Sequence, residues 1–489
     1  MQTPNILVLM CDQLQARAVY EPGLCATPHL DRLRERALSF TRAYTPNAVC
    51  SPARASLMTG KLPHNHNVMW VTHTMAPDQV RIREGLPHFA EDLVRAGYRT
   101  SYVGKWHVEP SERPSWYGWQ RDRSSRSPEL ACRPTRPHGE LLPSVTISGE
   151  GYETATLAGV TPVGPEDRAM GAIVDTARDE LRDLVKTDVP WCLFVSLPEP
   201  HDPYITGLEA YRGYDGWAMD RPANWSDDLA GRPRIYQRAA AAFAPLTDEE
   251  RMLAARCYYA SISEIDARFG RLLDDLSRLN LEEETVVVLT TDHGDYLGAH
   301  GMYCKNLGAW EEAYNVPLVI RGPGIRTGAS RARVGTHALF PSLLRHYDIP
   351  TQIACDAPLF DDALPAQEAA PADFSPAGDD AHTDGFAEYH GGRLLLTQRI
   401  VYHDNWKLVW NGFDDHEFYR LDADPGELEN LAGVNGPALD RTGEIAEAYR
   451  EVTRRLWLEV VRTGDATLLN SQYIGLRASE IGPVSIGGA

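Results

Sequence analysis

The chain has 489 residues, with 68 acidic side chains against 48 basic ones and a formal net charge of −20. So large an acidic excess argues against nucleic acid and anionic membranes as partners. No apolar stretch reaches the length of a transmembrane helix, and the apolar run at residues 6–10 is too short for the core of a signal peptide. The eight cysteines are scattered without paired spacing, so we expect reduced thiols and a cytoplasmic location.

Short apolar runs alternate with amphipathic segments through the first two thirds of the chain. This alternation predicts an α/β fold built on a doubly wound, mostly parallel sheet. Strands are expected at residues 5–10, 100–103, 191–197, 285–290 and 316–320. Helices are expected from Thr27-Pro28 onward, over 86–96 and 169–185, and from a cap at Thr247 through Leu272.

The pattern changes in the last third of the chain. Residues 351–384 are rich in alanine, proline and aspartate, which is typical of a linker or a long surface loop. Three short strands and a helix follow, at 393–401, 406–410, 418–421 and about 445–461. We therefore expect a catalytic domain over residues 1–350, the linker, and a smaller C-terminal subdomain over 385–489 with an antiparallel sheet and a helix.

Polar side chains follow four of the predicted strands. In an open parallel sheet, ligands bind beyond the carboxyl ends of the strands. Each of these side chains alone has an ordinary structural explanation, such as a helix cap or a solvated charge. Together, at four strand ends, they predict a functional site. In chain order they are Asp12 and Gln13, Lys105 and His107, His201, and Asp292 and His293.

The segment CSPARASLMTG, residues 50–60, is typical of the start of a helix. Pro52 is tolerated in the first turn, and Gly60 is a suitable stop. Cys50 and Arg54 lie four residues apart and should share a helix face near the partly positive N-terminus. From this spacing alone, Cys50 is either a buried structural cysteine or a thiolate activated by the helix and by Arg54.

The same segment resembles the signature of the sulfatase family of the alkaline phosphatase superfamily. Further stretches resemble that family in the same order along most of the chain. They are PNILVLMCDQ, TPHLDRL, GKWH, TTDHGDYLGAHGMYCK, NVPLVIRGPG, WKLVWN and EFYRLDADPGELENLA. The resemblance implies an alkaline-phosphatase-like fold and an arylsulfatase-like sulfuric ester hydrolase. It also implies that Cys50 is oxidised after synthesis to formylglycine, by a separate formylglycine-generating enzyme.

The resemblance further implies a site for one divalent cation. Its ligands would be Asp12, Gln13, the modified Cys50, Asp292 and His293. Many sulfatases carry a second aspartate where this chain has Gln13, so here an amide oxygen takes that place and one negative charge is missing. Mostly oxygen ligands favour Ca²⁺. The histidine nitrogen makes Mn²⁺ an alternative.

For catalysis, the resemblance implies positive charge around the ester. Arg54, Lys105 and Lys305 are expected to neutralise the sulfate oxygens together with the cation. The hydrate of the formylglycine would attack sulfur, and His201 or Lys305 would protonate the leaving alcohol. His107 would then take a proton from the remaining hydroxyl, so that sulfate leaves. The expected substrate is a small-molecule or sugar sulfate ester.

Two other functions stay open at this level. The DQ and DH pairs at residues 12–13 and 292–293 also resemble phosphonate monoester and phosphodiester hydrolases of the same superfamily, although GKWH keeps the lysine and histidine of a sulfatase. A catalytically silent homologue that only binds a metal or an anion would have lost Arg54, Lys105 or His107, and all three are present. The sequence leaves open whether the chain forms a homo-oligomer.

Overall fold

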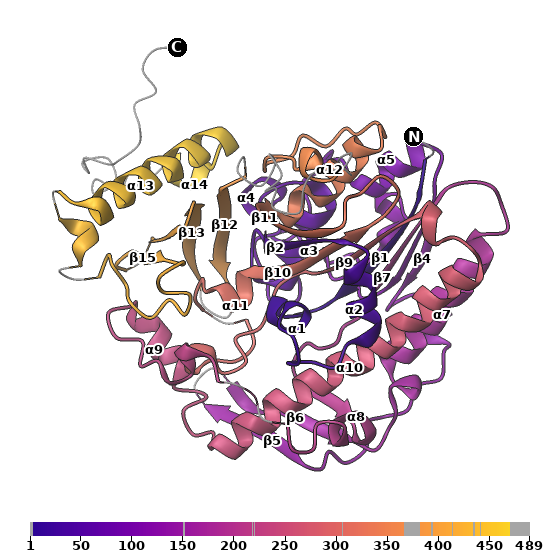
Figure 1. Ribbon diagram of the computed structural model, residues 1–489, viewed down its shortest axis with the longest axis horizontal. Coiled ribbons are helices and arrows are strands. Elements are labelled where there is room, and N and C mark those ends of the chain that lie inside the picture. Colours follow the sequence, from indigo (N-terminus) through magenta and orange to yellow (C-terminus); the bar gives the residue numbers. More distant parts are fainter. Residues whose placement is uncertain are drawn as a thin grey trace.

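The computed structural model describes residues 3–469, apart from residues 150–151, 218, 220, 306, 366–381, 393–394, 413, 434–435 and 441. A large eight-stranded sheet forms its centre, and a small four-stranded sheet lies beside it (Figure 1). The large sheet has the order β11 (Gly328–Gly335), β2 (Leu38–Tyr44), β10 (Asn315–Arg321), β9 (Thr285–Thr291), β1 (Asn5–Cys11), β7 (Trp191–Ser196), β3 (Arg99–Gly104) and β4 (Arg121–Ser124). Among these strands only β10 runs antiparallel to its neighbours, which confirms the predicted mostly parallel sheet.

Alternate residues of each central strand point to opposite faces of the sheet and join different apolar cores. In β1, Leu7 and Leu9 belong to one core, whereas Ile6, Val8 and Met10 belong to the other. Burial on both faces explains why these strands appear in the sequence as continuous apolar runs. The five strands predicted for this sheet are present, and β2, β4 and β11 were not predicted.

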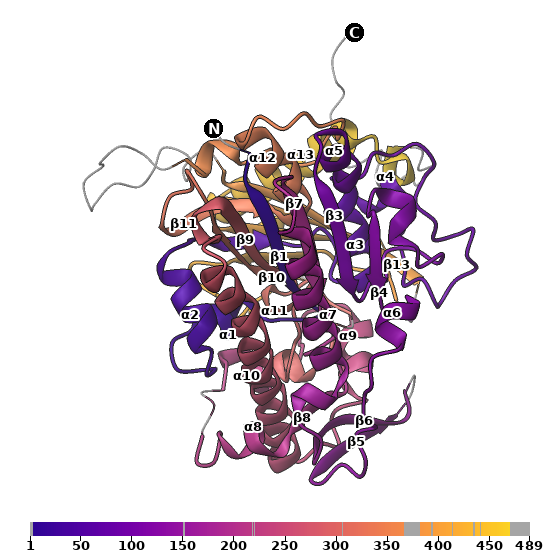
Figure 2. The same ribbon diagram turned by 90° about the vertical axis from the view of Figure 1, so that its right-hand side faces the viewer.

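Helices cover both faces of the large sheet. One face carries α2 (Pro28–Glu35), α7 (Ala169–Leu184) and α10 (Asp248–Arg278), and Figure 2 shows α7 and α10 side by side. The cap predicted at Thr247 is present as a capping box with Glu250. The other face carries α3 (Cys50–Thr59), α5 (Phe89–Arg95) and α12 (Leu339–His346).

The helix predicted over residues 86–96 is shorter than expected. It begins only at Phe89, because His88 is its cap: the His88 side chain accepts a hydrogen bond from the Ala90 N–H, and the Glu91 carboxylate accepts one from the His88 N–H. Pro87 also disfavours helical geometry in the residue before it.

The small sheet consists of four antiparallel strands covered by a helix. These are β12 (Asp384–Gly391), β13 (Leu395–His403), β14 (Trp406–Asn411), β15 (Glu417–Arg420) and α13 (Glu444–Thr463). Val452, Leu456 and Val460 of α13 pack against Leu408 and Phe418 of the sheet. The antiparallel sheet and its helix were predicted, whereas β12 was not.

Shorter elements complete the described part of the chain. A three-stranded sheet is formed by β5 (Ser144–Gly149), β6 (Tyr152–Thr161) and β8 (Tyr204–Gly207). The remaining α-helices are α1 (Ala16–Tyr20), α4 (Pro63–His66), α6 (Pro128–Ala131), α8 (Leu208–Arg212), α9 (Arg234–Ala240), α11 (Glu311–Tyr314) and α14 (Ala466–Leu469). No helix within these described ranges is long and apolar enough to cross a membrane. All eight cysteines fall within the described residues, and none forms a disulfide.

The first part of the segment predicted as a linker packs against the large domain. Ile353, Phe360 and Leu364 are buried. The Asp356 carboxylate accepts hydrogen bonds from Lys61 Nζ and from the Leu62 N–H, both at 2.9 Å. Residues 366–381 of this segment lie outside the described residues.

A buried carboxylate connects the small sheet to the large domain. Glu388 of β12 is 0% exposed and accepts from Nδ1 of His64, in α4, and from Nε2 of His390, both at 2.5 Å. Burial alone would lower the pKa of His64, but the charge of Glu388 and its hydrogen bond raise it above the usual value. Burial lowers the pKa of His390. Of the two histidines bonded to Glu388, His64 is therefore the one favoured to carry a positive charge.

We expect the contribution of His64 to stability to depend on pH. Because the folded-state pKa is raised, the stabilisation is fully present below the unfolded value of about 6.5 and is lost as pH rises through the folded value. His64→Gln should therefore lower the free energy of unfolding by on the order of 2 kcal/mol at low pH, and by less at alkaline pH. Denaturant unfolding at a series of pH values measures this difference.

His403→Gln is the matched control, because His403 forms a more exposed pair with Asp384 in the same sheet. His403→Gln should lower the free energy of unfolding only slightly at every pH. A His64→Gln loss that does not change with pH would contradict the assignment of the charge to His64.

Candidate active site

Four neighbouring parallel strands bring the predicted polar side chains to one edge of the large sheet. Strands β9, β1, β7 and β3 are adjacent in this order and run in the same direction. Their carboxyl ends therefore meet at one edge. Helix α3 begins beside them, with Cys50 in its first turn and Gly60, at a φ of 70°, as its left-handed cap.

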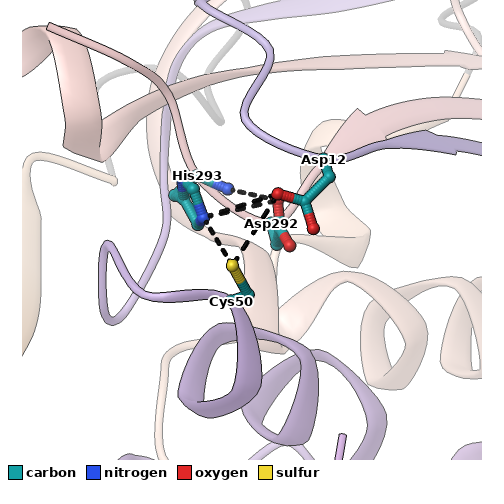
Figure 3. Close-up of side chains that lie close together, drawn as sticks. All are labelled: Asp12, Cys50, Asp292 and His293. Atoms are coloured by element: carbon teal, nitrogen blue, oxygen red, sulfur yellow. Dashed lines mark hydrogen bonds and ion pairs between the residues drawn. The ribbon is translucent and has the colours of Figure 1, made fainter. Parts of the chain in front are cut away.

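Four buried side chains face one another at this edge (Figure 3). They are Asp12, Cys50, Asp292 and His293, and one potential ligand atom from each lies within 4.8 Å of the others. The Cys50 sulfur is 3.2 Å from Nε2 of His293 and 3.7 Å from Oδ1 of Asp12. The structure thus brings together four of the five residues that the resemblance assigned to the cation.

The guanidinium group of Arg54 holds the two carboxylates of this cluster. Arg54 is 0% exposed, and it donates to Oδ2 of Asp12 at 3.0 Å and to Oδ2 of Asp292 at 2.7 Å. Its remaining nitrogen, Nη1, donates to Oγ of Ser196 and to the carbonyl of Lys105, both at 2.9 Å. Each of the three nitrogens therefore has a protein acceptor. Oδ1 of Asp12 faces the cluster, and Oδ1 of Asp292 also accepts from the N–H groups of Gln13 and His293, at 3.1 and 3.0 Å.

The donor atoms of the cluster suit a divalent cation. Two carboxylate oxygens are hard ligands of the kind that Ca²⁺ and Mn²⁺ accept. Nδ1 of His293 lies 2.8 Å from the carbonyl of Gly294, which favours a proton on Nδ1 and leaves Nε2 as a ligand. Burial and the charge of Asp12 raise the pKa of Asp292. A cation between the two carboxylates would relieve this repulsion.

Positive charge around Cys50 favours an anion at this position. Burial alone would raise the pKa of the thiol, but the charges of Lys305 and Lys105 bring it well below the usual value. His293 and His107 act in the same direction. The helix N-terminus adds further partial positive charge. These surroundings favour a negative charge at residue 50, unlike the apolar surroundings of a structural cysteine.

Gln13 lies beside the cluster, and its amide group is bound by other side chains. Its backbone is left-handed, with a φ of 70°. Nε2 donates to Oδ1 of Asp202 at 3.1 Å and to the Asp295 carboxylate, while Oε1 accepts from Nζ of Lys305 at 2.8 Å. In this arrangement Lys305 occupies the amide oxygen that the resemblance assigned to the cation.

His201 and Lys305 form a pair at the edge of the cluster. Nζ of Lys305 is hydrogen-bonded to Nε2 of His201, and Nδ1 of His201 lies 2.6 Å from the carbonyl of Asp202. This geometry favours a proton on Nδ1 of His201 and a donor role for Lys305. Nε2 of His201 is 3.9 Å from Oδ1 of Asp12, so the pair borders the cation cluster.

Lys105 and His107 follow β3 at the same edge. Nζ of Lys105 is 2.5 Å from Oδ2 of Asp12. Burial and the charge of Cys50 would raise the pKa of Asp12. The charges of this lysine, His201 and Arg54 outweigh both effects and lower the pKa, so Asp12 stays ionised. His107 has a left-handed backbone, with a φ of 50°, and its N–H donates to Oε2 of Glu112 at 3.3 Å.

Sequence reasoning missed several residues that support this site. Asp202 and Asp295 directly follow two of the predicted strand-end clusters, so their acidic side chains were a usable signal. The buried Asp295 carboxylate accepts from the Tyr204 hydroxyl at 2.8 Å, and burial raises its pKa to about 6. Ser196 carries no such signal, because only the fold brings it to Arg54.

Comparison with known proteins agrees with this geometry. A choline-sulfatase from Rhizobium meliloti is 27% identical over 480 residues, which cover 93% of this chain and 87% of the relative. An N-acetylglucosamine-6-O-sulfatase from Bacteroides thetaiotaomicron is 23% identical, over 88% of this chain and 83% of that protein. The crystal structure of a phosphonate monoester hydrolase of Agrobacterium radiobacter has a similar fold, with a TM-score of 0.74, 20% identity and coverage of 98% and 99% of the two chains. The sulfatase family model matches residues 4–349, more than half of the chain. The chain therefore belongs to the sulfatase family of the alkaline phosphatase superfamily.

Proposed function

We propose that this protein hydrolyses a sulfate monoester at residue 50, with a divalent cation held by Asp12, Asp292 and His293. The observation that carries the proposal is the place of Cys50: its sulfur belongs to the candidate cation cluster and is surrounded by lysine and histidine side chains. A cation held by these residues would supply positive charge for the sulfate oxygens, beside residue 50. Membership of the sulfatase family supports hydrolysis of sulfate esters.

The proposal includes oxidation of Cys50 to formylglycine by a maturation enzyme. When present, this group supplies a hydrate with one oxygen for attack and a second hydroxyl whose deprotonation releases sulfate. The other tasks fall to the chain's own side chains. Lys105 and Lys305 stabilise negative charge at residue 50 and on the sulfate oxygens. His107, whose side chain helps to lower the pKa of Cys50, accepts a proton from the hydroxyl at residue 50.

The His201–Lys305 pair is the proposed proton source for the leaving alcohol. The two side chains share a hydrogen bond at the border of the cation cluster, so a proton that leaves one is replaced through the other. Arg54 has an indirect role in this proposal. Its hydrogen bonds to Asp12, Asp292 and Ser196 make it a residue that positions the cation ligands.

The names of two relatives support a proposal for the substrate class. The names of the choline-sulfatase and the N-acetylglucosamine-6-O-sulfatase point to a small alcohol or a sugar as the carrier of the sulfate. Phosphonate or phosphodiester hydrolysis is the second candidate, because the chain shares its fold with a phosphonate monoester hydrolase. We favour Ca²⁺ as the cation, with Mn²⁺ as the alternative. Eight unpaired cysteines support a reducing compartment such as the cytoplasm.

The test of the proposed function is a comparison of matched esters. Protein from the native host should hydrolyse a nitrophenyl sulfate with a higher kcat/KM than the corresponding phosphonate monoester or phosphodiester. Peptide mass spectrometry of the same preparation should show residue 50 as an aldehyde. Cys50→Ala should abolish turnover without loss of the fold, as judged by circular dichroism.

A higher kcat/KM for the phosphonate ester would replace the sulfatase assignment by the second candidate. Full activity in a preparation that carries only unmodified thiol would exclude the formylglycine.

Removal of one carboxylate should remove the cation. We expect Asp292→Ala to lose bound Ca²⁺ in elemental analysis and to lose activity by at least a hundredfold, because its carboxylate is one of the two in the candidate cluster. Asp202→Asn is the matched control, since Asp202 lies outside the four-residue cluster. It should keep the wild-type metal content. An Asp292→Ala protein that retains stoichiometric cation would refute this ligand set.

The proton source can be separated from the groups that only neutralise charge. An acid helps most when the leaving alcohol is a poor one. His201→Ala and Lys305→Ala should each slow alkyl sulfates far more than an activated nitrophenyl sulfate, which makes kcat/KM depend more steeply on the leaving-group pKa. Because the two residues act as one pair, the double variant should be little worse than the poorer single one.

Arg54→Lys serves as the control for this series and should slow both kinds of ester about equally. If the dependence of kcat/KM on the leaving-group pKa keeps the wild-type slope in both His201→Ala and Lys305→Ala, neither residue protonates the alcohol.

A further inference from the structure

The loop that follows α4 is fixed at the edge of the active site by two hydrogen bonds. Nε1 of Trp70 donates to the carbonyl of His390, at the end of β12, at 2.7 Å. The N–H of Thr72 donates to Oγ of Ser51, the neighbour of Cys50, at 3.3 Å. Thr72 is buried and His73 is exposed. This loop therefore brings His73 next to the first turn of α3.

His73 meets His107 in a defined geometry. The two rings are nearly parallel, at 12°, with centroids 5.6 Å apart. Nδ1 of His73 lies 3.4 Å from Nε2 of His107. The left-handed backbone of His107, and the hydrogen bond from its N–H to Glu112, fix the Cα end of the His107 side chain. Such a backbone costs on the order of 1 kcal/mol in a residue with a Cβ, and this strain is found where a side chain must be aimed.

The hydrogen bond to His73 uses one ring nitrogen of His107 and leaves the other nitrogen unpaired. Nδ1 of His107 is buried and has no hydrogen-bond partner among the described residues. Burial, His107 and the nearby lysines lower the pKa of His73, which favours a neutral ring. The contact between the two rings allows Nε2 of His107 to donate and Nδ1 of His73 to accept, and in that tautomer Nδ1 of His107 carries no proton and can act as a base.

We propose that His73 is a positioning residue, whose Nδ1 accepts the Nε2–H of His107 and thereby keeps Nδ1 of His107 as the atom that takes a proton from residue 50. The same bond stabilises the imidazolium that forms when Nδ1 has taken that proton. This inference rests on the proposed function, in which His107 is the base. It adds to the site a residue that lies in an exposed loop and does not follow a strand of the sheet.

The tautomer of His107 tests the inference without any substrate. Full-length protein with Cys50→Ser presents a hydroxyl at position 50 and needs no maturation. After labelling with ¹⁵N-histidine, the signals of His107 are assigned by their loss in His107→Gln. We expect the Nε2–H tautomer in this protein and in His73→Asn, whose side-chain oxygen can accept in place of Nδ1. His73→Phe keeps a ring but removes the acceptor, and it should lose this preference.

Kinetics of the mature enzyme provide the second measurement. His73→Phe should lower kcat by about 10–100-fold with little change in KM, and His73→Asn should restore most of it. Thr74→Ala, the next residue of the same loop, is the matched control and should leave kcat unchanged, because its hydroxyl donates only to the carbonyl of Val71.

Three results would overturn the role of His73. They are an unchanged tautomer in His73→Phe, equal losses in the Phe and Asn variants, and a rise in KM that depends on the alcohol, which would make His73 a substrate contact. A wild-type enzyme without sulfatase activity would refute the proposed function instead, and the tautomer result would still decide the placement of the proton.

Discussion

The paired salt bridges of Arg54 with Asp12 and Asp292 are the constraint on which the rest of the site depends. The two carboxylates directly follow different strands, β1 and β9, and the guanidinium comes from α3. All three side chains are buried, so each charge needs the others: loss of one partner would leave an uncompensated charge in the interior, at a cost of roughly 3–5 kcal/mol. One guanidinium thus fixes the helix against the sheet.

The same constraint explains why Cys50 precedes Arg54 by four residues. Residues at this spacing share a helix face. With Arg54 fixed between the carboxylates, one turn towards the N-terminus of α3 brings Cys50 to their Oδ1 side, at 3.7 Å from Asp12. A local concentration of lysine and histidine around it coexists with a net charge of −20, because surface charges beyond about 10 Å are largely screened, whereas the buried groups are not. The acidic chain is therefore compatible with an anionic substrate.

Sequence reasoning predicted the features that local patterns encode. The central strands were found because burial on both faces makes them continuous apolar runs, and their polar ends then located the site. The edge strand β11 was missed because its sequence GASRARVG contains a serine, two arginines and two glycines, and β12 because it directly follows an alanine- and proline-rich segment. The direction of the Gln13 amide depends on a left-handed backbone and on Lys305, which lies 292 residues away. His73 belongs to an exposed loop with no periodic pattern, so only the fold reveals its partner.

The small sheet takes part in building the active site, although it contributes none of the proposed cation ligands. The N–H of Glu388, in β12, donates to the carbonyl of Pro46 at 2.8 Å, four residues before Cys50. The carbonyl of His390, two residues further along the same strand, accepts from Trp70 in the loop that carries His73. Strand β12 therefore fixes both the segment that leads into α3 and the loop that lies over its first turn. A rigid strand that supports two catalytic segments at once reduces the freedom of each, which is the condition for groups that must act within a few tenths of an ångström.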